Sequence, residues 1–321
     1  MFKKSFALMA LATVASASHA EFFLMAAETP PGNNPPANWG GIQRYSFASS
    51  GAAAVTETGI ASNMVSDPYG ITRSADGEFF IGNRHGNSGQ SSISRFVLDG
   101  GDNFVANGVL TNSSMHSTHG MGFQPGTGNL YAISAHSQMS LFTQPGFNNA
   151  GNLPIAGQRD MAFNAAGTDF YSTQANGSLR RYNVGSGVST FFNIAGASNL
   201  HQIVRNGNDL YAADFGSGGV YRIVLNGAGD VASSSLVANV AGAIGVAFST
   251  DGQEMFVAGH QTANITRFMF DTNTQTWGQT GVINTGALGI GNLYVYDPVP
   301  EPATMLVLGA GAAVLARRRR R

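Results

Sequence analysis

The chain has 321 residues, of which 43% are hydrophobic and 11% charged, and it contains 42 glycines but no cysteine. A domain of this size without cysteine must be held together by core packing rather than by disulfides. Residues 21–298 contain ten arginines, no lysine and 17 acidic residues, which gives a net charge of −7 with histidine neutral. This balance excludes nucleic acid as a partner, because phosphate binding needs a basic surface.

The first 20 residues have the three parts of a secretory signal peptide. Lys3 and Lys4 precede an apolar run from Phe6 to Val14, and small residues then lead up to Ala20. The apolar run is about half of the roughly 20 residues that a membrane-spanning helix needs, which argues against a permanent anchor. We therefore expect export by the Sec machinery and cleavage after Ala20.

The central region contains a pattern that recurs along the chain. Copies begin at Asp67, Ser117, Gly157, Asn199 and Gly242. Each copy contains a short apolar strand, a turn rich in glycine, aspartate and asparagine, a second strand, a polar turn and a third strand. A weaker fourth strand fits the interval before the next copy, for example near Phe104, Ser189 and Ser234.

The spacing of these copies is typical of β-propeller blades. Successive spacings are 50, 40, 42, 43 and 44 residues when counted between the first-strand positions Ile71, Met121, Met161, Ile203, Val246 and Ile290. A composition rich in glycine and poor in charge also suits many short strands joined by tight turns. The sequence therefore predicts an all-β fold, with no long helix between the two termini.

The ring is predicted to close through a blade shared by the two ends of this region. The sixth copy begins at Gly286 and stops after two expected strands, whereas Ile42–Phe47 matches the third-strand pattern and a fourth strand could follow from Ala52. Pairing these strands removes exposed sheet edges. We predict a propeller over residues 38–298, preceded by a flexible linker over residues 21–37, with six four-stranded blades. Seven blades are the alternative if the long first interval contains extra strands.

The strand pattern of the units resembles that of NHL-type six-bladed propellers and of the strictosidine synthase and lactonase-like group. The copies that begin at Asp67, Ser117, Gly157, Asn199 and Gly242 carry this resemblance, and no catalytic motif of those families accompanies it. It implies the six-bladed fold, and for the lactonase-like members an enzymatic activity.

An arginine recurs in the third strand of five copies, at Arg44, Arg95, Arg181, Arg222 and Arg267. One residue at the same place in several repeats usually does the same structural job. We therefore expect these arginines to bond to neighbouring carbonyl or carboxylate groups rather than to form a ligand-binding ring of cations.

Histidines and carboxylates are predicted to gather on one face of the ring. The turns after the second strands contain His85, His136, His260 and Asp214, and the turns that enter the first strands contain His116, His119, Arg159, Asp160 and His201. Both kinds of turn emerge on the same face, where propellers usually carry their function. Such groups could act as acid and base or bind a divalent metal. No tight metal-ligand spacing is present, and no cofactor is predicted.

The end of the chain resembles the PEP-CTERM sorting signal. The triplet Pro300, Glu301 and Pro302 is followed by an apolar stretch from Ala303 to Ala316 and by the basic cluster Arg317, Arg318, Arg319, Arg320 and Arg321. The resemblance covers residues 299–321. It implies an exported protein of a Gram-negative-type bacterium, an exosortase as the processing partner and a transient inner-membrane anchor, with the arginines on the cytoplasmic side. The final place would be the cell surface or the extracellular medium.

Two classes of function fit these features. The first is a binding or structural propeller of the cell envelope or exopolysaccharide matrix, with polysaccharide or envelope proteins as partners. The second is an extracytoplasmic enzyme of the lactonase or lyase kind that uses the face rich in histidine and aspartate. The sorting-signal resemblance favours the first class.

Overall fold

The computed structural model describes residues 21–29, 40–84, 91–134 and 138–298. These residues form 24 strands in six antiparallel sheets of four strands each, and they contain no helix. The predicted six-bladed, all-β propeller is confirmed. Among the described segments there is no helix that could cross a membrane.

Five blades each come from one continuous stretch of chain, and their strands run in order from the axis to the rim. The first contains β4 (Pro68–Arg73), β5 (Phe79–Asn83), β6 (Ser92–Leu98) and β7 (Phe104–Thr111). The second contains β8 (Thr118–Phe123), β9 (Leu130–Ser134), β10 (Met139–Thr143) and β11 (Asn148–Leu153). The third contains β12 (Gln158–Phe163), β13 (Asp169–Gln174), β14 (Ser178–Asn183) and β15 (Ser189–Asn193). The fourth contains β16 (Leu200–Asn206), β17 (Asp209–Asp214), β18 (Gly219–Leu225) and β19 (Val231–Asn239). The fifth contains β20 (Ala243–Phe248), β21 (Glu254–Gly259), β22 (Asn264–Asp271) and β23 (Thr276–Asn284).

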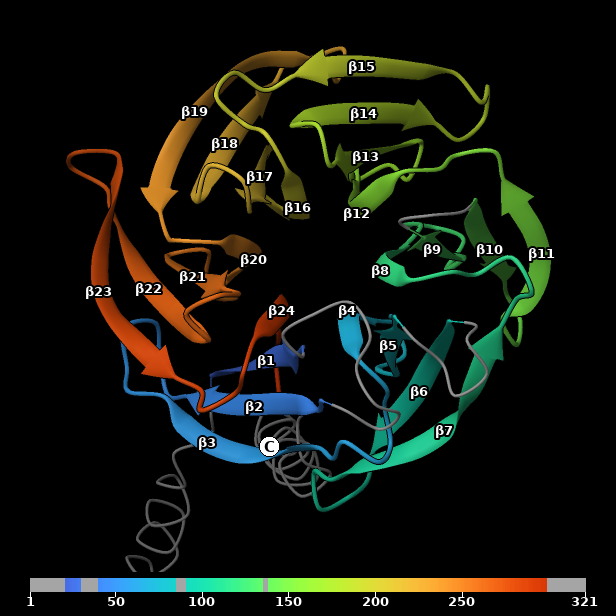
Figure 1. The fold of residues 1–321 in the computed structure, drawn as a ribbon, viewed down its shortest axis with the longest axis horizontal. Helices are drawn as coiled ribbons and strands as arrows, with labels where there is room; N and C mark the ends of the chain where they lie inside the picture. Colours follow the sequence, from blue (N-terminus) through green and yellow to red (C-terminus); the bar gives the residue numbers. More distant parts are fainter. Residues whose placement is uncertain (1–20, 30–39, 85–90, 135–137, 299–321) are drawn as a thin grey trace, which may run out of the picture.

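The sixth blade joins the two ends of the propeller. From the axis outward it contains β24 (Ile290–Tyr296), β1 (Phe22–Glu28), β2 (Ile42–Phe47) and β3 (Val55–Ile60). Figure 1 shows this blue and red blade completing the ring, with the innermost strands of all six blades facing the axis. The predicted closure by N-terminal and C-terminal strands is therefore confirmed.

Three details of the predicted closing blade are wrong. Residues 286–298 supply one strand rather than two. The missing strand is β1, so residues 22–28 do not belong to the expected linker over residues 21–37, and the propeller begins well before residue 38. The reason is burial, because six of the seven residues of β1 are buried between β24 and β2. The equivalent of Val246 in β24 is Leu293 rather than Ile290, since both Val246 and Leu293 donate their amides to Gln202.

The hydrophobic core is divided among the six interfaces between blades. Phe22, Phe47 and Phe256, for example, pack together between the sixth and fifth blades, with Phe22 and Phe47 stacked at 4.8 Å between ring centroids. Comparable clusters lie between every other pair of neighbouring blades. Each blade is therefore stabilised mainly by its two neighbours, as expected for a repeat architecture.

The third-strand arginines form ion pairs, which confirms the structural prediction made for them. In four blades the partner is an acidic residue at or just before the start of the second strand of the same blade; the pairs are Arg95 with Glu78, Arg181 with Asp169, Arg222 with Asp209 and Arg267 with Glu254. Arg44 in the closing blade instead pairs with Asp102 of the first blade.

Four of these five arginines also contact the next blade, at its turn between the third and fourth strands. Arg181 bonds to Asp230 at 2.9 Å, and Arg267 bonds to the carbonyl of Ala52 at 2.6 Å. The Arg95 guanidinium lies 5.1 Å from the ring centroid of Phe147, and Arg44 reaches its partner Asp102 in the same kind of turn. The arginines thus connect neighbouring blades along the rim.

Candidate functional site

The top face of the propeller, defined as the end at which the innermost strands begin, is closed by a hydrogen bond across the ring. Tyr69 belongs to the first blade and His201 to the opposite, fourth blade, and Tyr69 Oη lies 3.1 Å from His201 Nδ1. The ring of His119 packs on Tyr69 with 4.5 Å between ring centroids, and the Arg84 guanidinium lies 5.3 Å from the Tyr69 ring centroid. These contacts tie three blades together at the top of the central channel.

His201 and His119 are both buried in this cluster. His201 is only 6% exposed, and burial, together with the charge of Arg159, lowers its pKa to about 3. Its imidazole is therefore neutral at physiological pH. His119 is 3% exposed, and its Nε2 lies 2.9 Å from the hydroxyl of Ser117. Both residues act here as packed, hydrogen-bonded groups between blades.

His260 stabilises the point where the ring closes. Its Nδ1 lies 2.9 Å from the carbonyl oxygen of Ile290 and 3.1 Å from the hydroxyl of Thr29. Ile290 begins the last strand of the propeller, and Thr29 directly follows β1. The imidazole of the fifth blade is thus bonded to both chain segments that form the inner half of the sixth blade.

A layer of polar side chains lies below the top face, where backbone amides of the innermost strands point into the channel. Gln202 Oε1 accepts from the amides of Val246 at 2.9 Å and Leu293 at 2.8 Å, and its amide nitrogen donates to the carbonyl of Leu293 at 2.6 Å. Asp160 Oδ2 accepts from the amide of Ile203 at 3.1 Å. Gln202 therefore connects three blades and Asp160 connects two.

Burial raises the pKa of Asp160 to about 8, although the amides of Met161 and Ile203 oppose this shift. The carboxyl group is thus mainly protonated at neutral pH. A side chain on Gly120 would overlap Asp160 Oδ1, so only glycine at that position leaves room for the carboxyl group. A buried acid of this kind facing a channel is a candidate proton donor.

Asp214, the last residue of β17, has a different role at the turn that follows the strand. It accepts hydrogen bonds from the backbone amides of Ser198 at 2.9 Å and Asn199 at 2.7 Å, and from the Ser217 hydroxyl at 2.6 Å. Burial raises its pKa, but these bonds outweigh that effect and hold the pKa below its usual value. Asp214 is therefore an ionised turn-capping residue.

The structure brings only some of the sequence-predicted candidates together. His119 and His201 both contact Tyr69, and Asp160 lies in the layer below, whereas Asp214 and His260 bond to separate turns and strands. His116 is exposed, and His85 and His136 lie outside the described residues. Among the described residues no three histidine, aspartate or glutamate side chains come close enough to hold a metal ion.

Three central residues were not predicted from the sequence. Tyr69, Gln202 and Asn292 occupy the innermost strands, and all three are at least nine-tenths buried. A signal for two of them exists, because aligning the first strands places Gly70, Gly120, Asp160, Gln202, Gly245 and Asn292 at one equivalent position, directly before the inward-facing amides. Polar residues at a position occupied by glycine in other blades indicate a shared space on the axis.

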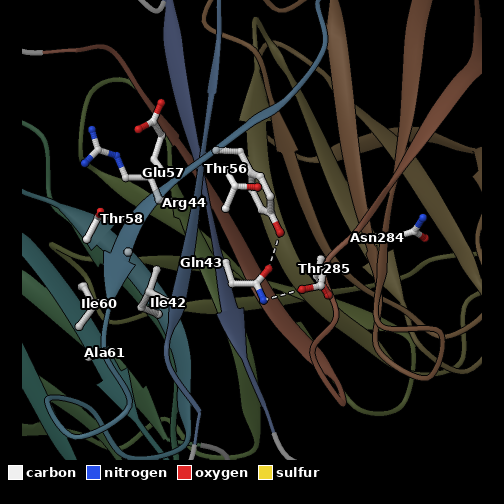
Figure 2. Close-up of a pocket in the computed structure, with 12 residues that line it drawn as sticks. Ile42, Gln43, Arg44, Thr56, Glu57, Thr58, Ile60, Ala61, Asn284 and Thr285 are labelled. Carbon is white, nitrogen blue, oxygen red and sulfur yellow. Dashed lines mark hydrogen bonds between the residues drawn. The ribbon is translucent and has the colours of Figure 1, made fainter.

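Of the cavities in the described part of the structure, one lies in the channel and another on the closing blade. One, of about 290 Å³, lies in the lower half of the channel between Asp160 and Gln202 and the ends of the innermost strands, where Phe123, Phe163 and Phe248 line it. The other, of about 400 Å³, is an open groove on the closing blade along β2 and β3, beside Asn284 and Thr285. Figure 2 shows the Gln43 amide pointing to the Thr285 carbonyl, at 2.9 Å, while Arg44 and Glu57 point away from it.

Comparisons with solved structures support the fold alone. A chain of a nidogen–laminin complex superimposes with a TM-score of 0.65 at 11% identity, covering 85% of this chain and 98% of that one. The periplasmic gluconolactonase of Pseudomonas aeruginosa gives 0.61 at 12% identity, covering 87% and 100%. A putative 6-phosphogluconolactonase of Bacteroides fragilis gives 0.57 at 16% identity, covering 86% and 98%. No curated protein sequence matches the chain.

One family model matches the sequence, that of the PEP-CTERM protein-sorting motif, over residues 298–321. The motif implies export, a membrane-anchoring sorting signal at the C-terminus and an exosortase as processing partner. Nearly all of the matched segment lies outside the described residues, so the match rests on its sequence. The chain is thus a six-bladed β-propeller that carries a PEP-CTERM sorting motif.

Proposed function

We propose that this propeller has a binding or structural role in the cell envelope or the exopolysaccharide matrix. The observation that carries the proposal is the use made of the candidate catalytic groups. His119, His201 and His260 are engaged in contacts between blades or across the ring closure, and Asp214 caps a turn. Residues with these duties hold the ring in shape, which leaves the outer surfaces and loops as the places that contact a partner.

The proposed route follows from the two ends of the sequence. The Sec machinery exports the chain, the signal peptide is removed after Ala20, and the C-terminal segment holds the protein transiently in the inner membrane. An exosortase then acts at the motif around Pro300–Pro302, and the propeller reaches the cell surface or the medium. Polysaccharide or envelope proteins are the partners that this location offers.

An enzymatic function is the second candidate, supported by one feature of the channel. Asp160, with its pKa raised to about 8, lines a cavity of about 290 Å³ together with apolar side chains. A protonated carboxyl group in such a cavity could protonate a leaving group, as a lyase or a lactonase would require. The described part of the channel contains no group of three metal ligands beside it.

The test compares binding and catalysis in one preparation. The exported protein is incubated with exopolysaccharide from the producing cells, and co-sedimentation is measured alongside hydrolysis of a panel of sugar lactones. We expect retention on the polysaccharide, no lactone hydrolysis, and the same retention for Asp160→Asn. Lactone hydrolysis that disappears in Asp160→Asn, without retention on the polysaccharide, would replace the binding role with the enzymatic one.

A further inference from the structure

The outermost strands of the six blades differ in one respect. Five of them, β3, β7, β11, β19 and β23, pair with their neighbours through a register shift, which marks a β-bulge or similar irregularity. In the third blade, β15 pairs with β14 in continuous register from Ser189 to Asn193. Bulges twist an edge strand away from pairing with other chains, so β15 is the one outer edge in the described residues that lacks this protection.

The side chains of β15 are suited to pairing. Phe191 is 57% exposed, and Val188, directly before the strand, is 61% exposed. The Arg180 guanidinium lies 5.2 Å from the centroid of the Phe191 ring and bonds to the Ser189 hydroxyl at 2.7 Å, which holds the ring against the blade. Residues 184–196 contain no charged residue. The edge segment itself therefore lacks the charged side chains with which natural proteins blunt an open edge, and the nearest charge, that of Arg180 on β14, is bonded back to Ser189.

We propose that β15 pairs with β15 of a second copy of this chain, in antiparallel orientation about a two-fold axis. Antiparallel pairing uses alternate backbone groups, so the groups of β15 that do not bond to β14 point outward along the rim, where Figure 1 places β15 outermost. In a two-fold pair each residue meets residues of the same segment. A charged edge would repel itself, whereas the neutral β15 edge does not.

A second copy is also the partner that sorting supplies. This argument rests on the proposed sorting route, by which copies of this chain that carry the motif reach the same membrane surface and so raise their local concentration. A pairing of only five residues on each side is weak in dilute solution and gains from that concentration. The propellers would then be joined in pairs through a continuous sheet of eight strands.

The absence of cysteine makes a direct test available in cells that export the whole chain. Single cysteines are introduced at Thr190, Phe191 and Phe192 in turn, and dimers are measured on non-reducing gels. Cross-strand neighbours in antiparallel pairs lie within disulfide reach. We expect a dimer band that peaks at one of these positions. Val109 on the bulged strand β7 is 59% exposed, and Val109→Cys should give a much weaker band.

A second substitution then separates specific pairing from chance collision. Added to the best cysteine variant, a lysine directly beside the cysteine (Thr190→Lys with Phe191→Cys, or Phe191→Lys with Thr190→Cys or Phe192→Cys) should reduce the dimer band by about five-fold, because the two lysines would then lie near each other on either side of the two-fold axis. Val109→Lys should leave the band unchanged. Equal bands at all cysteine positions, including Val109→Cys, would overturn the proposal, as would a reduction of equal size by the two lysine substitutions. Crosslinks of β15 to another envelope protein instead of to a second copy would overturn it too.

Discussion

The rim and the axis of the propeller both connect blades, but they use different chemistry. On the rim, the same residue type recurs in five blades, and in four of them the arginine also contacts the following blade. At the axis, Asp160, Gln202 and Asn292 stand where other blades have glycine, and no two of these polar residues are alike. A contact that each blade makes for itself can use the same residue type in every repeat. The axis is a single space that all blades share, so its residues must differ for one set of side chains to fill it.

The largest effect is expected from the most buried ion pair of the rim. Arg267 is 11% exposed and Glu254 is completely buried. The substitution Arg267→Met would leave a buried carboxylate without its cation and remove the bond to Ala52, at a cost of about 3–5 kcal/mol in the free energy of unfolding. Denaturant unfolding at neutral pH measures this cost. The control is Arg205→Met, an exposed arginine, and a loss no larger than in that control would contradict a rim held by buried pairs.

Substitution of Gln202 removes hydrogen bonds that connect three blades at the axis. Replacement by leucine would leave the amides of Val246 and Leu293 and the carbonyl of Leu293 without the partners they have now, for a loss of about 3 kcal/mol. Gln124 offers a matched control, because it too bonds to a carbonyl of the next blade, that of Gly167, at 2.8 Å, but is only half-buried. Gln124→Leu should cost less than about 1 kcal/mol. Equal losses of stability in the two variants would show that the hydrogen bonds of Gln202 at the axis contribute no more than those of Gln124.

The rim was the more predictable of these two regions. The repeated strands predicted the number of blades, and the recurrence of the arginine predicted its structural role, because each blade is built from the same local contacts. The strand β1 was missed, since no other copy begins with a detached segment such as Phe22–Glu28 and since the chain between β1 and β2 reads as a linker. The partner of Tyr69 could not be read from the sequence, because His201 lies 132 positions away and meets it only when the ring is closed.

The dependence of stability on pH tests the protonation states of Asp160 and His201 near the axis. Asp160 keeps its proton in the folded state up to a pKa of about 8, whereas the unfolded chain loses it near the ordinary value of 3.8, so its contribution to stability falls as the pH rises between these values. His201 has a folded pKa of about 3 against an ordinary value of 6.5, so its contribution rises with pH over that lower range. The two effects oppose each other up to pH 6.5.

Between pH 6.5 and 8 the effect of Asp160 on stability is therefore no longer opposed by that of His201. There the free energy of unfolding should fall by up to about 1.4 kcal/mol per pH unit, and Asp160→Asn should remove that fall. In His201→Gln the fall should extend to lower pH, because the opposing contribution is gone. Denaturant unfolding at half-unit pH steps measures both curves. A wild-type curve identical in shape to that of Asp160→Asn would show that the carboxyl group is not held protonated in the folded ring.

The smallest effect separates the two duties of the rim arginines. Arg222 bonds to Asp209 at 2.6 Å within its own blade, but the pair is far more exposed than that of Arg267, with 40% of the arginine and 17% of the aspartate side chain open to solvent. No described residue of the following blade bonds to Arg222. Solvent screens such a pair, so Arg222→Met should cost about 0.5 kcal/mol, and added salt should remove most of the difference from wild type. A cost close to that of Arg267→Met would mean that the pair within each blade dominates. The small expected cost would instead show that the arginines stabilise the propeller mainly through burial and through their contact with the next blade.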